Sequence, residues 1–267
     1  MLTVVKNNFK FLLQSIKCNL LASKEYRTSF VVQTVFMFIN NGFFLIFWGA
    51  IFKINDNNIN GVIMRDILYL WSISPLAYGI AYFLFGGVDN ICNNIITGKF
   101  DTYLLYPKHP LISAVTSKTD FSACGDLIYG LVIGLFAVSF SPGKYILLIL
   151  YSILGAVFFI ASGIMIQMLS VWFGDIREIA EKYKFGMLVQ FSIYPEVIFK
   201  KWIKILLYTV VPVAYTTYVP FKLIEYFSIQ NLFLFLLAII TYIALVLFVY
   251  NKAIKYYESG NAIGLME

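Results

Sequence analysis

Four long apolar runs dominate the sequence and decide what it can fold into. They cover residues 30–52, 67–85, 123–140 and 145–173, and a fifth run covers 232–250. Each approaches or exceeds the roughly 20 apolar residues that carry a helix across a bilayer. Barrel strands would be shorter, and an open sheet would leave backbone groups unpaired in hydrocarbon. The runs therefore predict an all-α integral membrane protein.

The composition excludes the main alternatives. The chain has 267 residues, of which 60% are hydrophobic and 13% are charged, whereas soluble domains carry about 25% charged residues. A soluble enzyme is therefore excluded. One histidine and three scattered cysteines, Cys18, Cys92 and Cys124, predict neither a metal site nor a disulfide framework. The only basic run is Lys200-Lys201, so we expect no nucleic-acid partner.

The residues ahead of the first run predict an interfacial helix within 1–28. Four lysines fall within about 40° of one another on a helical wheel, and they are Lys6, Lys10, Lys17 and Lys24. Apolar residues cover the opposite side. A basic stripe opposite an apolar face is typical of a helix lying in the headgroup layer. The alternative is a helix packed on another subunit.

Positive charge predicts the topology, because loop lysines and arginines gather on the cytoplasmic side. The four lysines and Arg27 precede the first run and put the N-terminus inside. The loop 55–60 is then outside, 87–122 inside and 141–144 outside. Six crossings would return the C-terminus, with Lys252 and Lys255, to the cytoplasm.

The fifth crossing has two interpretations. The stretch 185–218 is apolar but contains Pro195 and Pro212 and three lysines. Either the crossing lies around 184–194 and an external re-entrant segment, 193–228, follows, or 205–221 crosses. Charge bias favours the second. Two prolines inside a lipid-facing span need special accommodation, which favours the first.

The segment after the second run carries the most informative pattern. In VDNICNNIITG the apolar residues recur at helical spacing, and Gly98 is a natural helix stop. A helix continuous over 67–97 would measure about 46 Å, longer than a hydrocarbon core of about 30 Å, so its end would project into the cytoplasm. Its apolar stripe needs a partner, either the protein's own third span or a soluble protein. The stripe consists of Val88, Ile91, Cys92, Ile95 and Ile96.

A second cytoplasmic element is expected at 174–184, in GDIREIAEKYK. Asp175 and Glu178 have the spacing of a capping box. Arg177 with Glu181, and Glu178 with Lys182, have the spacing of i, i+4 ion pairs. The segment is interpreted either as a further contact for a cytoplasmic partner or as a plain solvated connector.

Polar residues inside the runs are candidates for a translocation path. They are Asn40, Asn41, Asp126 and Gln167. A charged aspartate inside a membrane is costly and often functional, although local pairing is an alternative for Asp126. Hydrogen bonding between helices is the alternative for the amides. Gly130 and Gly134 form a GxxxG pair, which predicts a close-packing face.

Two stretches resemble the membrane subunits of ABC-2 type exporters, in the six-helix branch of viologen and drug exporters. The first is IITGKFDTYLLYPKHPL, with matches at Ile96, Gly98, Phe100, Asp101, Leu104, Leu105, Pro107, Pro110 and Leu111. Two positions differ from the family pattern: Lys99 stands where an acidic residue is usual, and Tyr106 stands where an arginine is usual. Both differences would affect which ATPase the surface fits. The second stretch matches the late prolines of the family at Tyr194, Pro195, Pro212 and Pro220.

The resemblance implies a dimeric permease, of like or unlike subunits, in a bacterial cell membrane. It would couple through its cytoplasmic loops to a pair of ATP-hydrolysing subunits, and it favours the re-entrant interpretation of 193–228. The chain would be a single transmembrane domain, 1–267, with its coupling region at 87–122. The coupling residues implied are Ile91, Ile95, Ile96, Gly98, Phe100, Asp101, Leu104, Leu105, Pro107 and Pro110.

Nucleotide chemistry is assigned to the partner. Gly98-Lys99 is followed by Phe100 and Gly143-Lys144 by Tyr145, so neither forms the GK[ST] of a P-loop. ATP and Mg²⁺ would bind the partner subunit, and this chain would need no cofactor. An amphipathic or hydrophobic cargo, whether drug, peptide or lipid, would move outward.

Two other classes of function fit the sequence less well. A secondary transporter or channel predicts inverted repeats and buried ionisable residues, and only Asp126 qualifies. A membrane-embedded enzyme lacks its chemistry, because the sole histidine, His109, has no carboxylate cluster beside it.

Overall fold

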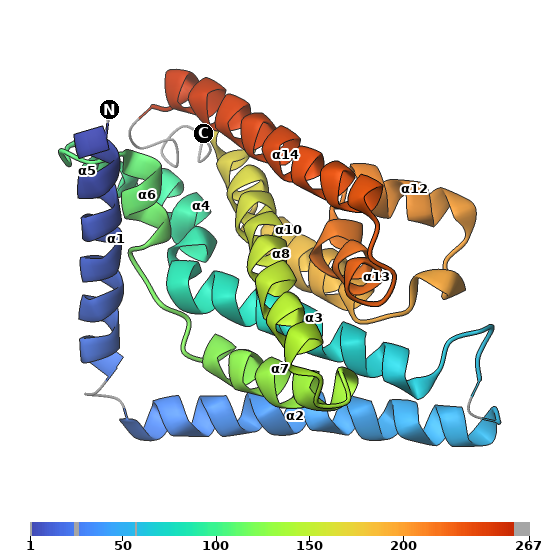
Figure 1. Ribbon diagram of the computed structural model, residues 1–267. Coiled ribbons are helices and arrows are strands. Elements are labelled where there is room, and N and C mark those ends of the chain that lie inside the picture. The colour runs from blue at the N-terminus through green and yellow to red at the C-terminus, as the bar shows by residue number, and fades with distance from the viewer. Residues whose placement is uncertain (1, 24–26, 57, 259–267) are drawn as a thin grey trace.

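The computed structural model describes residues 2–23, 27–56 and 58–258, and these residues are almost entirely helical (Figure 1). The all-helical prediction is therefore confirmed, and the only β-pairing in the described ranges is an isolated bridge between Ile59 and Val62. The elements are α1 (Leu2–Ser23), α2 (Arg27–Ile54), α3 (Met64–Phe85), η2 (Gly86–Asn90), α4 (Ile91–Ile96), α5 (Phe100–Leu104), α6 (Pro110–Val115), α7 (Ala123–Ala137), α8 (Pro142–Met168), α9 (Ser170–Phe173), α10 (Arg177–Glu181), η3 (Lys182–Val189), α11 (Gln190–Ser192), η4 (Glu196–Ile198), α12 (Lys201–Thr209), η5 (Ala214–Tyr218), α13 (Val219–Glu225) and α14 (Ile229–Tyr256).

Four helical stretches of the described chain are long and apolar enough to cross a membrane. They are α2, Met64–Ile96, Pro142–Phe173 and α14. A fifth span results if the bent pair Lys201–Thr209 and Ala214–Glu225 counts as one. Helix α7 has 15 residues, about 22 Å at 1.5 Å per residue. The chain is thus a multi-pass membrane protein, and six crossings remain a prediction.

The helices are arranged with two distinct ends (Figure 1). Helices α2, α3 and α7 lie side by side along one edge, α8 packs on α3, and α14 covers α8. One end carries α4, α5, α6 and the last turns of α14, and α1 lies there roughly at right angles to α2. The loop after α2, the start of α8 and helix α12 lie toward the opposite end.

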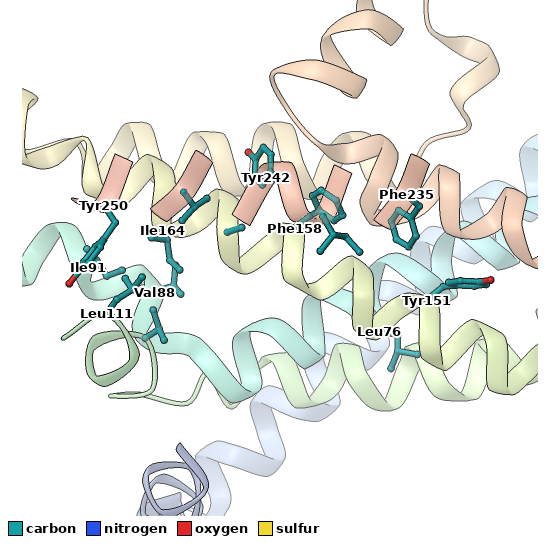
Figure 2. Close-up of a cluster of buried hydrophobic side chains, with 14 of the residues drawn as sticks. Leu76, Val88, Ile91, Leu111, Tyr151, Phe158, Ile164, Phe235, Tyr242 and Tyr250 are labelled. Carbon is teal, nitrogen blue, oxygen red and sulfur yellow. The ribbon is translucent and has the colours of Figure 1, made fainter. Parts of the chain in front are cut away.

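One buried apolar strip joins the membrane helices to the end that carries α4 and α6 (Figure 2). Phe158 of α8 packs against Phe235 and Tyr242 of α14, with ring centroids 6.1 and 5.6 Å apart. The same cluster continues to Val88 and Ile91, both fully buried. The short helices at this end are therefore part of the same core as the spans.

The helical stretch Met64–Ile96 reaches the expected end of the second run, but it is not α-helical throughout. It changes to a 3-10 turn at Gly86–Asn90 and resumes as α4. A Cβ at Gly87 would lie 2.2 Å from the carbonyl oxygen of Ala114, and one at Gly86 would lie 2.7 Å from the amide nitrogen of Asp120. The two glycines thus allow the segment before α7 to approach the break closely, an effect that helical spacing cannot reveal.

A cluster of charges fixes the opposite end. Glu225, whose side chain is 8% exposed, accepts a 2.7 Å hydrogen bond from Lys144 and another from the Tyr69 hydroxyl. Arg65 lies 3.5 Å from the same carboxylate. The cluster joins the end of α13 to the starts of α3 and α8, and so holds the bent pair against the bundle.

The GxxxG pair forms a close-packing face, as predicted. A Cβ at Gly130 would lie 2.7 Å from the Cβ of Leu76 and 2.8 Å from the carbonyl oxygen of Ser72. At Gly134 the nearest atom, on the flexible side chain of Leu148, would be 3.3 Å away. Gly130 therefore sets the distance between α7 and α3.

We predict that Gly130→Ala lowers the stability of the protein, because the added methyl group pushes against backbone atoms of α3. Overpacking of this kind costs about 1–3 kcal/mol. Thermal unfolding in detergent, followed by tryptophan fluorescence, measures the change. Gly49→Ala in α2 is the matched control, because its Cβ would meet nothing within 4 Å. Equal melting temperatures for the two variants would contradict the packing described.

Candidate functional site

Helices α4, α5 and α6 form a ledge at one end of the bundle, and here we use that name for residues 86–117. The predicted coupling residues Ile91, Ile95 and Phe100 are fully buried within it. Helix α4 packs against α8 and α9 of the fourth apolar run. The apolar stripe is therefore covered by the protein itself, though by its fourth span and not its third. A soluble partner cannot contact these three side chains directly.

The outer surface of the ledge is formed by the turn that follows α5. Leu105 is 85% exposed and Leu104 is 39% exposed. Pro107 is exposed, whereas Ile96, Gly98, Asp101 and Pro110 are half-buried. Gly98 has a φ of +71°, so the predicted helix stop is confirmed, and the chain reverses there into α5. Of the predicted coupling residues, Leu104, Leu105 and Pro107 offer the most accessible side chains.

Gln167 stabilises the break in the second run. Its side-chain oxygen accepts a 3.0 Å hydrogen bond from the amide of Cys92, and its amide donates to the carbonyl oxygen of Asp89 at 3.3 Å. Such a break leaves backbone groups without helical partners, and buried groups of this kind need pairing. Gln167 is therefore a structural residue that hydrogen-bonds to the ledge from α8, which is the alternative given above for its amide. It does not line the cavity that contains Asp126.

An ion pair between a buried lysine and a half-buried aspartate joins the ledge to the connector. Lys184, 7% exposed, lies 2.7 Å from Asp89, and its ammonium is 4.5 Å from the ring centroid of Tyr82. A polar cavity of about 260 Å³ lies beside the pair. Sequence reasoning placed Lys184 only at the end of the connector and passed over Asp89. The sequence did contain a signal for this pair, because an aspartate and a lysine that each adjoin an apolar run are candidates for an ion pair.

The connector differs in detail from its prediction. Ile176 is the N-cap residue, so the capping box at Asp175 is not formed. Arg177 pairs with Asp175 at 2.5 Å, and not with Glu181 as predicted. The side chain and the backbone amide of Arg177 both donate hydrogen bonds to the Asp175 carboxyl and lower its pKa. Arg177 also donates to Asn93 on the ledge at 3.3 Å.

The second predicted pair of the connector is present. Glu178 and Lys182 lie 3.8 Å apart, and both side chains are more than four-fifths exposed. An exposed pair of this kind contributes little to stability. The connector is therefore attached to the ledge through Arg177 and Lys184, while its outer face is solvated.

Three of the four predicted path residues lie together in the membrane region. Asn40, Asn41 and Asp126 line a cavity of about 200 Å³ that also touches Trp71 and Tyr78. Asn41 is buried and donates a 2.6 Å hydrogen bond to Asp126. The second carboxylate oxygen is buried without a protein partner among the described residues. Asn40 is exposed on the outside of α2.

Helix η3 connects the ledge to this cavity. Its Lys184 contacts Asp89, whereas Phe185 and Val189 line the cavity of Asp126. The segment is a π-helix, a form that occurs frequently at functional sites. This short helix therefore contacts both the ledge and the cavity.

The prolines on which the resemblance rests lie at breaks or changes of helix type. Pro195 follows α11, and Pro212 lies in the break between α12 and η5, where the two halves are bent by 82°. Pro220 lies where the π-helical turn η5 changes to α13, within the helical stretch Ala214–Glu225. Tyr194 packs edge-on against Trp48, with ring centroids 5.9 Å apart.

The sequence matches the family model described as ABC-2 family transporter protein over residues 38–261. The chain belongs to the ABC-2 transporter family. Members of this family are the membrane subunits of ABC transporters, and ATP-binding subunits are their partners. No curated protein and no solved structure matches this ABC-2 permease. Its substrate must therefore be inferred from the site itself.

We predict that Lys184→Met destabilises the permease, because the Asp89 carboxylate is left half-buried without its partner. The loss is about 2–3 kcal/mol of unfolding free energy, measured by denaturation in detergent. Lys182→Met is the control and should be near neutral, since its pair is exposed. Adding Asp89→Asn to Lys184→Met should recover much of the loss, and an absence of recovery would contradict the pairing.

Proposed function

We propose that the chain is the permease subunit of an ATP-driven exporter that moves an amphipathic or hydrophobic substrate outward. The observation that carries the proposal is the exposed pair Leu104 and Leu105 on a ledge whose own core is continuous with the spans. Two adjacent exposed leucines on a short polar turn fit a contact with a soluble protein. A drug, a peptide or a lipid all fit the substrate class.

ATP binding would close the paired ATP-binding subunits, which hold ATP and Mg²⁺, and move the turn after α5. The ledge would pass that motion to Asp89, and the ion pair of Asp89 with Lys184 would pass it to η3. Phe185 and Val189 of η3 would then reshape the cavity at Asp126. Packed side chains and an ion pair thus connect the turn after α5 to the Asp126 cavity at every step. A contiguous network of this kind can carry a conformational change from one site to the other.

The proposed topology has six crossings in a bacterial cell membrane, with both termini in the cytoplasm. The ledge, α1 and the end of α14 would share the cytoplasmic side, which agrees with their common end of the bundle (Figure 1). The bent pair, with α13 held by Glu225, would form the extracytoplasmic re-entrant segment of 193–228. The fifth crossing would then comprise most of η3 and α11, around residues 184–194.

A second permease subunit, identical or related, is proposed to pack along α2. Only 17% of the apolar window of this helix is buried. Its outer face includes Phe36, Phe43 and Phe47, each more than half exposed, and the amide of Asn40. An amide facing hydrocarbon is unfavourable, whereas amides between helices form hydrogen bonds. Asn40 therefore supports a helical partner on this side.

We predict that Leu104→Asp combined with Leu105→Asp uncouples the permease while leaving it folded in the membrane. Two carboxylates at the centre of an apolar contact would have to be desolvated without partners. Co-purification with the ATP-binding subunit should fall at least tenfold. The neighbouring reading frames are the first place to look for that subunit, as a P-loop protein.

The control for this experiment is Tyr256→Asp, because Tyr256 is 64% exposed at the end of α14 on the same side of the bundle. It should co-purify normally. If the double leucine variant also co-purifies normally, the docking surface is wrong. Full-rate transport by the purified chain alone in vesicles would instead favour an ATP-independent transporter and overturn the whole proposal.

A further inference from the structure

A large groove separates α1 from the ledge. Its volume is about 870 Å³, and its walls come from the second half of α1 and from residues 103–117. Figure 1 shows α1 beside α5 and α6 at this end of the bundle. One described side-chain bond bridges the two walls, a 3.2 Å hydrogen bond from Asn19 to the carbonyl oxygen of Thr116.

The groove is positively charged. Lys17 of α1 and Lys108 of the ledge line it, and none of the described residues that line it is an aspartate or glutamate. Neither lysine has a carboxylate partner among the described residues. Gln14 and Ser15 add a neutral amide and a hydroxyl to the same wall. The arrangement suits a ligand that carries negative charge.

The groove also has an apolar part. Phe11 and Leu21 of α1 and Pro107 of the ledge contribute to its lining. Leu21 is 49% exposed, and Leu13 on the same helix is 52% exposed. A helix with exposed leucines that lies across the direction of the spans satisfies them by resting in the headgroup layer. The groove is therefore at the depth where phosphate groups and the first carbons of acyl chains are found.

We propose that this groove binds one anionic phospholipid, with its phosphate between Lys17 and Lys108 and its glycerol and acyl carbons along Phe11 and Leu21. Lysine ammonium groups are common ligands of phosphate. The cytoplasmic leaflet is rich in anionic lipid, which supplies the ligand at high local concentration. The bound lipid would hold α1 against the ledge. The inference rests on the proposed cytoplasmic position of the ledge, but not on docking of an ATP-binding subunit.

The test uses native mass spectrometry of the full-length chain, purified in detergent and titrated with dioleoyl phosphatidylglycerol or dioleoyl phosphatidylcholine. We expect one phosphatidylglycerol per chain, bound at least tenfold more tightly than phosphatidylcholine. Lys17→Gln combined with Lys108→Gln should reduce the affinity to that of phosphatidylcholine. Equal affinity of the wild-type chain for the two lipids would overturn the proposal, whatever the variants do.

Lys10→Gln combined with Lys99→Gln is the matched control, because both lysines are exposed on the same two elements and neither lines the groove. It should bind phosphatidylglycerol normally. Equal losses in both double variants would mean diffuse charge attraction and would overturn a defined site. If inorganic phosphate alone displaces the lipid, the ligand is a free anion and the lipid assignment is wrong.

A further arm separates the lipid from an acidic segment of a protein partner. If Lys17→Gln with Lys108→Gln abolishes co-purification of the ATP-binding subunit but leaves phosphatidylglycerol binding unchanged, the groove is a protein interface and the lipid proposal fails. A failure of the Leu104 and Leu105 experiment alone would leave the lipid result standing, since lipid binding is measured on the chain without that subunit.

Discussion

Backbone hydrogen bonding in a medium without water constrains every interruption of these helices. An amide hydrogen left unpaired in hydrocarbon costs several kcal/mol. At the break of the second run the side chain of Gln167 pairs with the amide of Cys92. At the break near Pro212 a ring that lacks an amide hydrogen lies beside the bend, and the amide of Val213 donates to Val211. Both interruptions, the 3-10 turn at Gly86–Asn90 and the bend at Pro212, thus include backbone amides that are paired locally.

The satisfied breaks produce a ledge that belongs to the membrane bundle and is not an appended domain. Val88 and Ile91 share a buried cluster with Phe158 and Tyr242, so the ledge and the spans cannot move independently without opening their common core. A polar contact adds to this coupling, because Lys184 of η3 pairs with Asp89 of the ledge while Phe185 and Val189 of the same helix line the Asp126 cavity. The arrangement suits a subunit moved by force applied from outside the membrane.

Sequence reasoning located most elements but could not identify partners. Hydrophobic length gave the long spans, and the glycine stop at Gly98 and the break near Pro212 followed from backbone chemistry. The apolar stripe containing Ile91 and Ile95 could be identified from its helical spacing. Its spacing alone could not show whether another protein or the chain's own helices cover it. The role of Gln167 and the two-glycine break depend on residues about thirty to eighty positions away, which periodicity does not encode.

The charge cluster at Glu225 bears on how the molecule is made. Arg65 and Lys144 belong to elements synthesised early, whereas their shared carboxylate follows at position 225. Before position 225 the ribosome has produced four of the five apolar runs, while Arg65 and Lys144 have not yet met this carboxylate. The outer end of the bundle can close only after the bent pair has been inserted. A chain truncated before Glu225 would lack the carboxylate that joins α13 to the starts of α3 and α8, and would be left open at this end.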